Sequence, residues 1–290
     1  MGVPLIDVGG FVIELPKNPI GSLGSDAVNW LTENLPWFFG GITWILNTMA
    51  EFTFDILAAI PPEIFTIIVA LIIWRTVGLK MVPIGAFFIL LIWNMGIWEE
   101  MIESVSLMIV ALIIAWIIGI PMGIWKAHSK IVNKLLTPVL DTMQTTPPMT
   151  YLIPAILFFG IGTAPSIVSI VIFTVAPPIR TTSLGIEEIP GEIIEAGKSF
   201  GASTRQIVTK IEFPIAKPAI LVGMNQSIMI GFTMVVLAGF IGAGGLGEEI
   251  IGGINRGLVG RALEAGISVV FLAIILDRVL RNIGSRGPGT

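Results

Sequence analysis

Long apolar stretches dominate the chain, and their length predicts helices that cross a membrane. A spanning helix needs about 20 mostly apolar residues. We expect five such helices over the ranges 61–78, 81–98, 101–125, 218–247 and 262–280. The uncharged run from Asp141 to Arg180 is too long for one crossing, and Gly160-Ile-Gly-Thr-Ala-Pro165 divides it into two more. The pattern therefore predicts an all-α, polytopic membrane protein with about seven transmembrane helices.

The stretch 37–60 has a different pattern, because its polar residues gather on one face. Apolar residues recur there at spacings of three and four, at Phe38, Ile42, Ile45, Met49, Phe52, Ile56 and Ile60. The opposite face carries Thr48, Glu51 and Asp55. We expect an N-terminal amphipathic helix that lies in the membrane interface. The alternative, a span with buried acids, is costly unless the acids are paired.

Residues 1–35 are rich in Gly, Pro, Asn and Asp and show no sustained period, so we expect a tail. We therefore expect three regions. Residues 1–60 hold the tail and the interfacial helix, 61–283 form the transmembrane domain, and 284–290 are a C-terminal tail.

Composition supports a membrane protein and excludes several functions. The chain is 54% hydrophobic and 12% charged, against about 25% charged residues in soluble proteins. The absence of cysteine excludes disulfides and thiolate metal sites. His128, the only histidine, lies between Lys126 and Lys130, where we expect a solvated loop rather than a catalytic or metal site. The net charge of −4 gives no reason to expect nucleic acid binding.

Basic residues indicate the orientation, because Lys and Arg concentrate on the cytoplasmic side. With seven crossings and the third running inward, the residues expected inside are Arg75, Lys80, Lys126, Lys130, Lys134, Arg180, Lys198, Arg205, Lys210, Lys217, Arg278, Arg281 and Arg286. Those expected outside are Lys17, Arg256 and Arg261. The C-terminus is then cytoplasmic.

The loop 181–217, expected on the inner side, contains signals for two short helices. Pro190 suits the first position of a helix, and Gly201 suits the left-handed residue that ends one. Ser203-Thr-Arg-Gln206 has the form of a capping box that starts a second helix, which we expect Pro214 and Pro218 to close. Taken alone, this pattern also fits an ordinary helical connection between two spans.

The same loop resembles the EAA signature of ABC importer permeases. Glu195-Ala-Gly is followed by three residues, Gly201, nine residues and Ile211-Glu-Phe-Pro214, whereas the signature reads EAA, Gly and I-x-L-P at this spacing. Gly197 and Phe213 depart from it conservatively. The resemblance implies the type I ABC importer permease fold and a coupling helix that docks on a separate ATPase. The residues implied in this contact are Glu195, Ala196, Gly197, Gly201, Ala202, Ser203 and Pro214.

Other segments resemble the glycine betaine/proline betaine permeases over roughly 60–283. They include Leu140-Asp-Thr-Met-Gln-Thr-Thr-Pro147, Tyr151-Leu-Ile-Pro154, Phe159-Gly-Ile-Gly162, Gly119-Ile-Pro-Met-Gly-Ile-Trp125, Arg180-Thr-Thr-Ser-Leu-Gly-Ile186 and Ser199-Phe-Gly-Ala-Ser203. The resemblance implies a permease in the bacterial plasma membrane that acts as a homodimer. Its partners would be cytoplasmic ABC ATPase subunits and an extracytoplasmic solute-binding protein. Other solutes remain open: choline, carnitine or trimethylamine N-oxide.

Two sequence motifs bear on whether the chain binds a cofactor. Gly242-Ala-Gly-Gly-Leu-Gly247 matches a dinucleotide fingerprint, but that fingerprint requires a preceding strand, and here a membrane run precedes it. We interpret it as a bend at the outer face. The sequence contains no P-loop motif, so the resemblance implies that ATP binds to a partner subunit and that this chain holds no cofactor. A membrane enzyme is disfavoured because no nucleophile and base pair stands out, and a scaffold without transport remains an alternative.

The uncharged spans limit where a solute could pass. The runs 104–125, 142–179 and 218–247 hold no ionisable residue, which argues against ion-coupled transport. Asn225, Met229 and Thr233 recur every four residues, and Gln144 lies in another helix, so we expect these four in the translocation path. Hydrogen bonds between helices are the alternative. Aromatic cages usually bind quaternary ammonium groups, and the resemblance implies that this cage lies on the binding protein.

Overall fold

The computed structural model describes residues 5–8, 11–14 and 20–285 of the chain. The chain divides into two compact units, Met1–Ile42 and Thr43–Thr290. The boundary lies within helix α2 (Pro36–Ala58). Apart from one short hairpin, the regular elements in the described residues are helices, which confirms the expected all-α class.

The first unit contains more regular structure than its sequence pattern predicts. Strands β1 (Leu5–Val8) and β2 (Phe11–Glu14) pair antiparallel, and helix α1 covers Ile20–Asn34. The expected tail over 1–35 thus contains a hairpin and a helix, which the sequence pattern did not predict. The first turns of α1 hold glycines and serines, which are weak helix formers, so helix propensity alone does not mark it.

The second unit is helical throughout its described residues. After α2 its elements are α3 (Pro62–Thr76), η1 (Leu79–Met81), α4 (Val82–Asn94), α5 (Trp98–His128), α6 (Lys130–Thr145), η2 (Pro148–Tyr151), α7 (Leu152–Phe159), α8 (Thr163–Thr174), α9 (Ala176–Glu187), α10 (Gly191–Ser199), α11 (Thr204–Ile207), the π-helical segment η3 (Val208–Glu212), α12 (Phe213–Ala238), η4 (Gly239–Ile241), α13 (Gly245–Asn255) and α14 (Val259–Ser285).

Four helical stretches within the described residues are long and apolar enough to cross a membrane. They are Trp98–His128, Thr163–Glu187, Thr204–Ile241 and Val259–Asn282. Helices α2 and α3 together would add a fifth, but they meet at a 96° bend. Two shorter apolar helical stretches, Leu79–Asn94 and Pro148–Phe159, account for other parts of the expected spans.

The structure confirms one expected helix break and corrects another. Gly160 and Gly162, with φ of 79° and 124°, separate α7 from α8 as predicted. The prediction that Pro214 and Pro218 close a short helix is wrong, because α11, η3 and α12 run on as one helical stretch. The Phe213 N–H donates to the Val208 carbonyl across a wide π turn. This turn precedes Pro214, and Pro218 lies inside α12.

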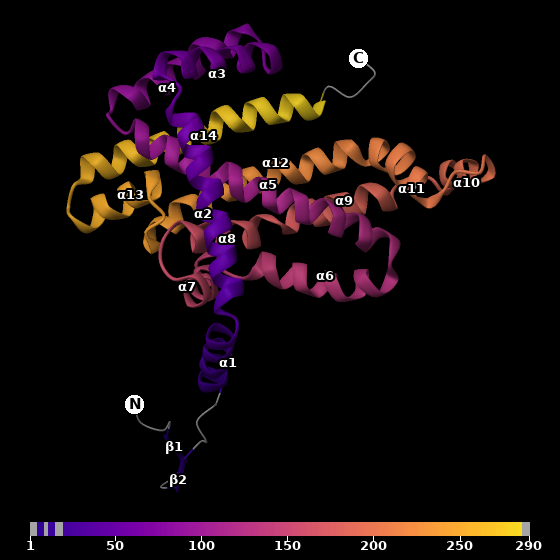
Figure 1. Ribbon diagram of the computed structural model, residues 1–290, viewed down its shortest axis with the longest axis horizontal. Coiled ribbons are helices and arrows are strands. Elements are labelled where there is room, and N and C mark those ends of the chain that lie inside the picture. Colours follow the sequence, from indigo (N-terminus) through magenta and orange to yellow (C-terminus); the bar gives the residue numbers. More distant parts are fainter. Residues whose placement is uncertain (1–4, 9–10, 15–19, 286–290) are drawn as a thin grey trace. The chain divides into compact units, whose positions relative to one another are not determined.

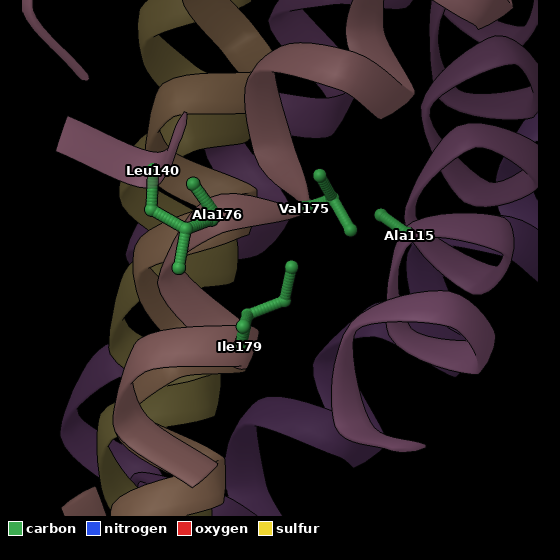
Figure 2. Close-up of a cluster of buried hydrophobic side chains, with 5 residues drawn as sticks. All are labelled: Ala115, Leu140, Val175, Ala176 and Ile179. Carbon is green, nitrogen blue, oxygen red and sulfur yellow. The ribbon is translucent and has the colours of Figure 1, made fainter. Parts of the chain in front are cut away.

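Helices α5, α9 and α12 form the centre of the second unit, where they pack side by side (Figure 1). One buried cluster joins α5, α6 and the junction of α8 with α9 (Figure 2). Its members are Ala115, Leu140, Val175, Ala176 and Ile179. A second cluster of Ile186, Ala216 and Ile220 joins α9 to α12. We call α5, α9 and α12 the three-helix core.

Glycines let the three-helix core pack closely. A Cβ at Gly123 of α5 would lie 2.6 Å from the Thr182 Cβ of α9. A Cβ at Gly185 of α9 would lie 2.6 Å from the Ala219 Cβ of α12. Because neither position has room for a side chain, displacement of one core helix is transmitted to the next.

Part of the polar face of helix α2 borders a cavity. Between residues 43 and 58, that face lines a cavity of about 360 Å³ together with the start of α5. The acids around the cavity are Glu51, Asp55, Glu99, Glu100 and Glu103. Ile45, Phe52 and Ile56 are exposed. A helix over this stretch is thus confirmed, while its position in the membrane interface stays a prediction.

Candidate functional site

The loop after α9 folds into a helical hairpin of residues 190–207, which we call the α10–α11 hairpin. Figure 1 shows it beyond one end of the three-helix core. Helix α10 has no buried residue, and its main contacts are with α11 and η3. The hairpin is therefore attached to the remainder of the second unit mainly through its two chain ends.

Hydrogen bonds fix the turn between the two helices. Gly201 has a φ of 78°, as predicted for the residue that ends α10. The Ala202 N–H donates to the Gly197 carbonyl at 3.1 Å, and the Gly201 N–H donates to the Lys198 carbonyl at 2.9 Å. This pair of bonds is a Schellman motif, which satisfies the last carbonyls of α10.

The predicted capping box is also present. The Ser203 N–H donates to Gln206 Oε1 at 2.7 Å, and the Gln206 N–H donates to Ser203 Oγ at 3.4 Å. Pro190 occupies the N-cap of α10, one residue before the expected position. Because both helix ends at the turn are hydrogen-bonded, the hairpin is stiff.

The tip of the hairpin presents a large apolar side chain. Phe200 is 92% exposed, and Glu195, Ala196 and Ser203 are exposed as well. The tip thus presents an exposed phenyl ring on a hydrogen-bonded support.

The remaining residues of the predicted contact lie elsewhere. Gly197 packs inside the hairpin, since a Cβ there would lie 2.6 Å from Ile211 Cδ1. Ala202 is half-buried. Pro214 lies in the first turn of α12, beyond the hairpin. The seven residues therefore form no single surface. Position 197 requires a small residue because Ile211 packs against it, not because a partner does.

His128 links the end of α5 to the segment that follows the hairpin. Its Nδ1 lies 2.8 Å from the Ile124 carbonyl, and its Nε2 lies 3.2 Å from Oε1 and 3.0 Å from Oε2 of Glu212. Both ring nitrogens thus face oxygen atoms. Glu212 is only 5% exposed. The expectation of a solvated loop at His128 is wrong, because α5 continues to this residue.

A second contact holds the segment that precedes the hairpin. Lys126 Nζ donates to Ser183 Oγ at 3.3 Å, and Ser183 Oγ donates to Glu187 Oε1 at 2.7 Å. We call the Lys126–Ser183 and His128–Glu212 contacts the α5 clamp. The paired residues lie 57 and 84 positions apart, so no local sequence signal predicts the clamp.

At the opposite end of the three-helix core, α5 caps the start of α13. Gly242, Gly244 and Gly245 have φ of 70°, 76° and 67°, so the glycine-rich segment forms a bend, as predicted. The Gly245 N–H donates to Glu103 Oε2 at 2.7 Å, and the Leu246 N–H donates to Ser104 Oγ at 2.8 Å. Helix α12 and η4 precede the glycines, so this is not a dinucleotide site.

Arg261 joins three helices at this end. Its Nε donates to Glu249 Oε2 of α13 at 2.9 Å, and its guanidinium also donates to Glu100 Oε1 of α5 at 2.8 Å. We call this region, with the capped start of α13, the α13 end.

The residues predicted to line a path do not all meet. Gln144 lines a cavity of about 240 Å³ with Gln226, which the sequence analysis did not select. Asn225 is half-buried, and its Oδ1 is enclosed. The exposed stripe of α12 runs through Val222, Gln226, Met229 and Thr233. The spacings along this stripe are four, three and four residues. They follow the helical period of about 3.6 residues better than the repeated spacing of four that predicted Asn225.

Comparison with known proteins places this architecture in a family. Residues 119–286 match the family described as "Binding-protein-dependent transport system inner membrane component". The chain belongs to this family. The matched residues include the hairpin, α9, α12 and the last part of α5.

Relatives of this inner membrane component cover nearly its whole length. It is 40% identical over 274 residues to the glycine betaine transport system permease protein OpuAB of Bacillus subtilis, covering 93% of this chain and 95% of the relative. It is 38% identical to the glycine betaine/proline betaine transport system permease protein ProW of Escherichia coli, covering 93% of this chain and 77% of that protein. The resemblance to this permease family is thus confirmed.

A solved structure shares its fold. A chain of the MetNI methionine ABC transporter, in an inward-facing conformation, aligns with a TM-score of 0.56 and 24% identity. The alignment covers 66% of this inner membrane component and 93% of the other chain. The predicted type I importer permease fold is confirmed.

Proposed function

We propose that this chain is the permease subunit of an ATP-driven importer of glycine betaine or a closely related quaternary ammonium solute. The solute class is supported by two relatives named as glycine betaine permeases. Its partners are cytoplasmic ATPase subunits, which bind the ATP, an extracytoplasmic solute-binding protein and a second copy of this chain. The chain itself catalyses no reaction.

The observation that carries the coupling role is the exposed Phe200 on a stiff, hydrogen-bonded tip. An exposed ring on a rigid support can enter a pocket on a partner without a large loss of conformational entropy. Glu195, Ala196, Gly201 and Ser203 complete the contact around Phe200.

The α5 clamp gives the hairpin a route to the membrane helices. When the ATPase subunits close on ATP, they displace the hairpin as a rigid body. Lys126 and His128 then pull on the end of α5, and the close glycine contacts pass the displacement to α9 and α12. The three-helix core tilts, and the path opens alternately to each side.

The first experiment reconstitutes the permease with its ATPase and binding protein in proteoliposomes. We expect ATP-dependent uptake of glycine betaine above that of choline, carnitine and trimethylamine N-oxide. Preferred uptake of one of these three would reassign the solute but keep the transport role. Absence of any uptake by an intact, ATP-hydrolysing complex would contradict the proposal.

A matched pair of variants tests the docking role of Phe200. We expect Phe200→Ser to abolish co-purification with the ATPase and to leave membrane abundance unchanged. The control is Ile161→Ser, because Ile161 is 77% exposed but lies between α7 and α8, beside η4. It should retain the ATPase. Equal retention by both variants would mean that the tip is not the docking surface.

The proposed orientation is tested by single cysteines, since the chain has none of its own. Lys210→Cys should react with an impermeant reagent only from the cytoplasmic side, and Arg261→Cys only from the outside. Outside labelling at position 210 would overturn the orientation, the cytoplasmic C-terminus and the docking of the hairpin on a cytoplasmic ATPase.

A further inference from the structure

The cavity that holds Gln144 and Gln226 has an unusual lining for its position. Its volume is about 240 Å³, and its walls come from α6, α8, α9 and α12. The lining residues are Met143, Gln144, Phe173, Pro177, Gln226 and Ile230. The only polar side chains among them are the two amides, and none of them is charged.

Gln226 lies near the middle of α12, inside the run 218–247 that has no charged residue. It is exposed, and so is Gln144. Neither side-chain amide donates or accepts a hydrogen bond within the described part of the chain. An unpaired amide facing lipid tails would lose its hydrogen bonds to water without replacement. This surface therefore faces an aqueous path or a polar ligand rather than lipid.

The wall beside the amides is held in place by Tyr151. Its hydroxyl donates to the Met143 carbonyl at 2.6 Å. Its ring lies 5.6 Å from the ring of Phe173, tilted by 48°. Tyr151 thus ties the backbone beside Gln144 to the ring of Phe173 before any ligand arrives.

We propose that this cavity is a contact site for the transported solute, a zwitterion with one carboxylate and one quaternary ammonium. The amide N–H groups of Gln144 and Gln226 donate to the carboxylate. The ring of Phe173 attracts the trimethylammonium group by a cation–π interaction. Because the lining is neutral, contact is weak and release is fast, as a path requires. This inference rests on the proposed transport function.

Single cysteines give a test that does not depend on uptake. In the assembled transporter, Gln226→Cys and Gln144→Cys are treated with a thiosulfonate that carries a trimethylammonium group. We expect both to react at least about tenfold faster than Ile228→Cys, because a buried thiol is inert. Ile228 is a close control, since it lies two residues from Gln226 and is 4% exposed. Saturating glycine betaine during ATP turnover should slow the reaction.

Reaction at the two glutamine positions no faster than at Ile228 would overturn the proposal, because the cavity would then be closed to water and solute. Fast reaction that glycine betaine does not slow would also overturn it as a contact site. Neither result bears on whether the wild-type permease imports the solute, so the proposed function would stand.

Two substitutions at Gln226 distinguish the effect of the amide group on uptake from the effect of side-chain size. Gln226→Leu removes the donor, and Gln226→Asn keeps an amide. We expect uptake of glycine betaine to fall about tenfold in Gln226→Leu and to recover partly in Gln226→Asn. ATP hydrolysis stimulated by the loaded binding protein should persist in both, because the docking surfaces are unchanged. Normal uptake by Gln226→Leu would show that the amide does not contact the solute.

Discussion

The two ends of the three-helix core are built in opposite ways. At the α13 end, backbone amides, a serine, three acids and Arg261 are joined by hydrogen bonds, and the backbone segments approach closely. At the other end, the α10–α11 hairpin is rigid within itself but is joined to the core through few contacts. The difference indicates where motion enters. We therefore expect the α13 end to resist deformation and the hairpin to move as one body, as the proposed coupling through the α5 clamp requires.

Helix α5 is the element common to both ends. It has 31 residues, which corresponds to a length of about 45 Å at 1.5 Å per residue. Its first turns supply Glu100, Glu103 and Ser104 to the α13 end, and its last turn supplies Lys126 and His128 to the clamp. A single helix thus connects the fixed end with the moving one.

The largest effect is expected at the α13 end, from Gly247→Ala. A Cβ at this position would overlap the Val235 carbonyl of α12, and backbone cannot move aside cheaply. We expect destabilisation of about 1–3 kcal/mol, measured as a lower thermal aggregation midpoint in detergent and lower membrane abundance. The control is Gly252→Ala in the same helix, where a Cβ meets nothing within 4 Å. Equal midpoints for the two variants would show that the α13 end is not tightly packed.

Removal of one partner of the clamp should have the next largest effect. His128→Gln removes the ring that lies 3.0 Å from the nearly buried Glu212 carboxylate. We expect a loss of about 1–3 kcal/mol, less than for a fully buried pair because the His128 side chain is 38% exposed. ATP hydrolysis should continue while uptake falls. The double variant His128→Gln/Glu212→Gln should regain stability but not uptake. Full uptake in the double variant would mean that the clamp transmits no force.

At the hairpin itself, we expect Gly201→Val to uncouple transport without loss of protein. A β-branched residue at φ 78° is strained by about 1–2 kcal/mol, which corresponds to about tenfold in the equilibrium constant between this turn and a relaxed one. Uptake per permease should fall by up to that factor, with normal membrane abundance. Gly191→Val is the matched control, because a Cβ there has open space and its φ is not positive. Normal uptake by Gly201→Val would make the hairpin a plain connector.

The smallest effect is expected from Ser104→Ala. This change removes the acceptor for the Leu246 N–H and leaves the other bonds of the α13 end in place. We expect a loss of about 1 kcal/mol, seen in the aggregation midpoint, and no change in the ratio of ATP hydrolysed to solute imported. A changed ratio would show that the α13 end also takes part in coupling.

Features with local causes were predictable from the sequence, and features with distant causes were not. The break at Gly160 and Gly162, the left-handed Gly201 and the capping box of Ser203 all follow from neighbouring residues. The continuation of α12 through Pro214 and Pro218 was missed, because the π turn and tertiary packing override the usual effect of proline. The His128–Glu212 pair and the meeting of Gln144 with Gln226 depend on helices brought together by the fold.

The hairpin tip has a consequence for how such permeases diversify. The hydrogen bonds that shape the turn all lie between residues 196 and 206, so a short stretch of chain encodes the tip by itself. Its attachments, in contrast, are its two chain ends, one of which runs on into α12, and the clamp contacts beside them to the distant helix α5. If the tip docks on the ATPase as proposed, substitutions on its exposed side would change which ATPase is recognised without altering the membrane helices. The proposed recognition surface and the membrane helices could then change independently in evolution.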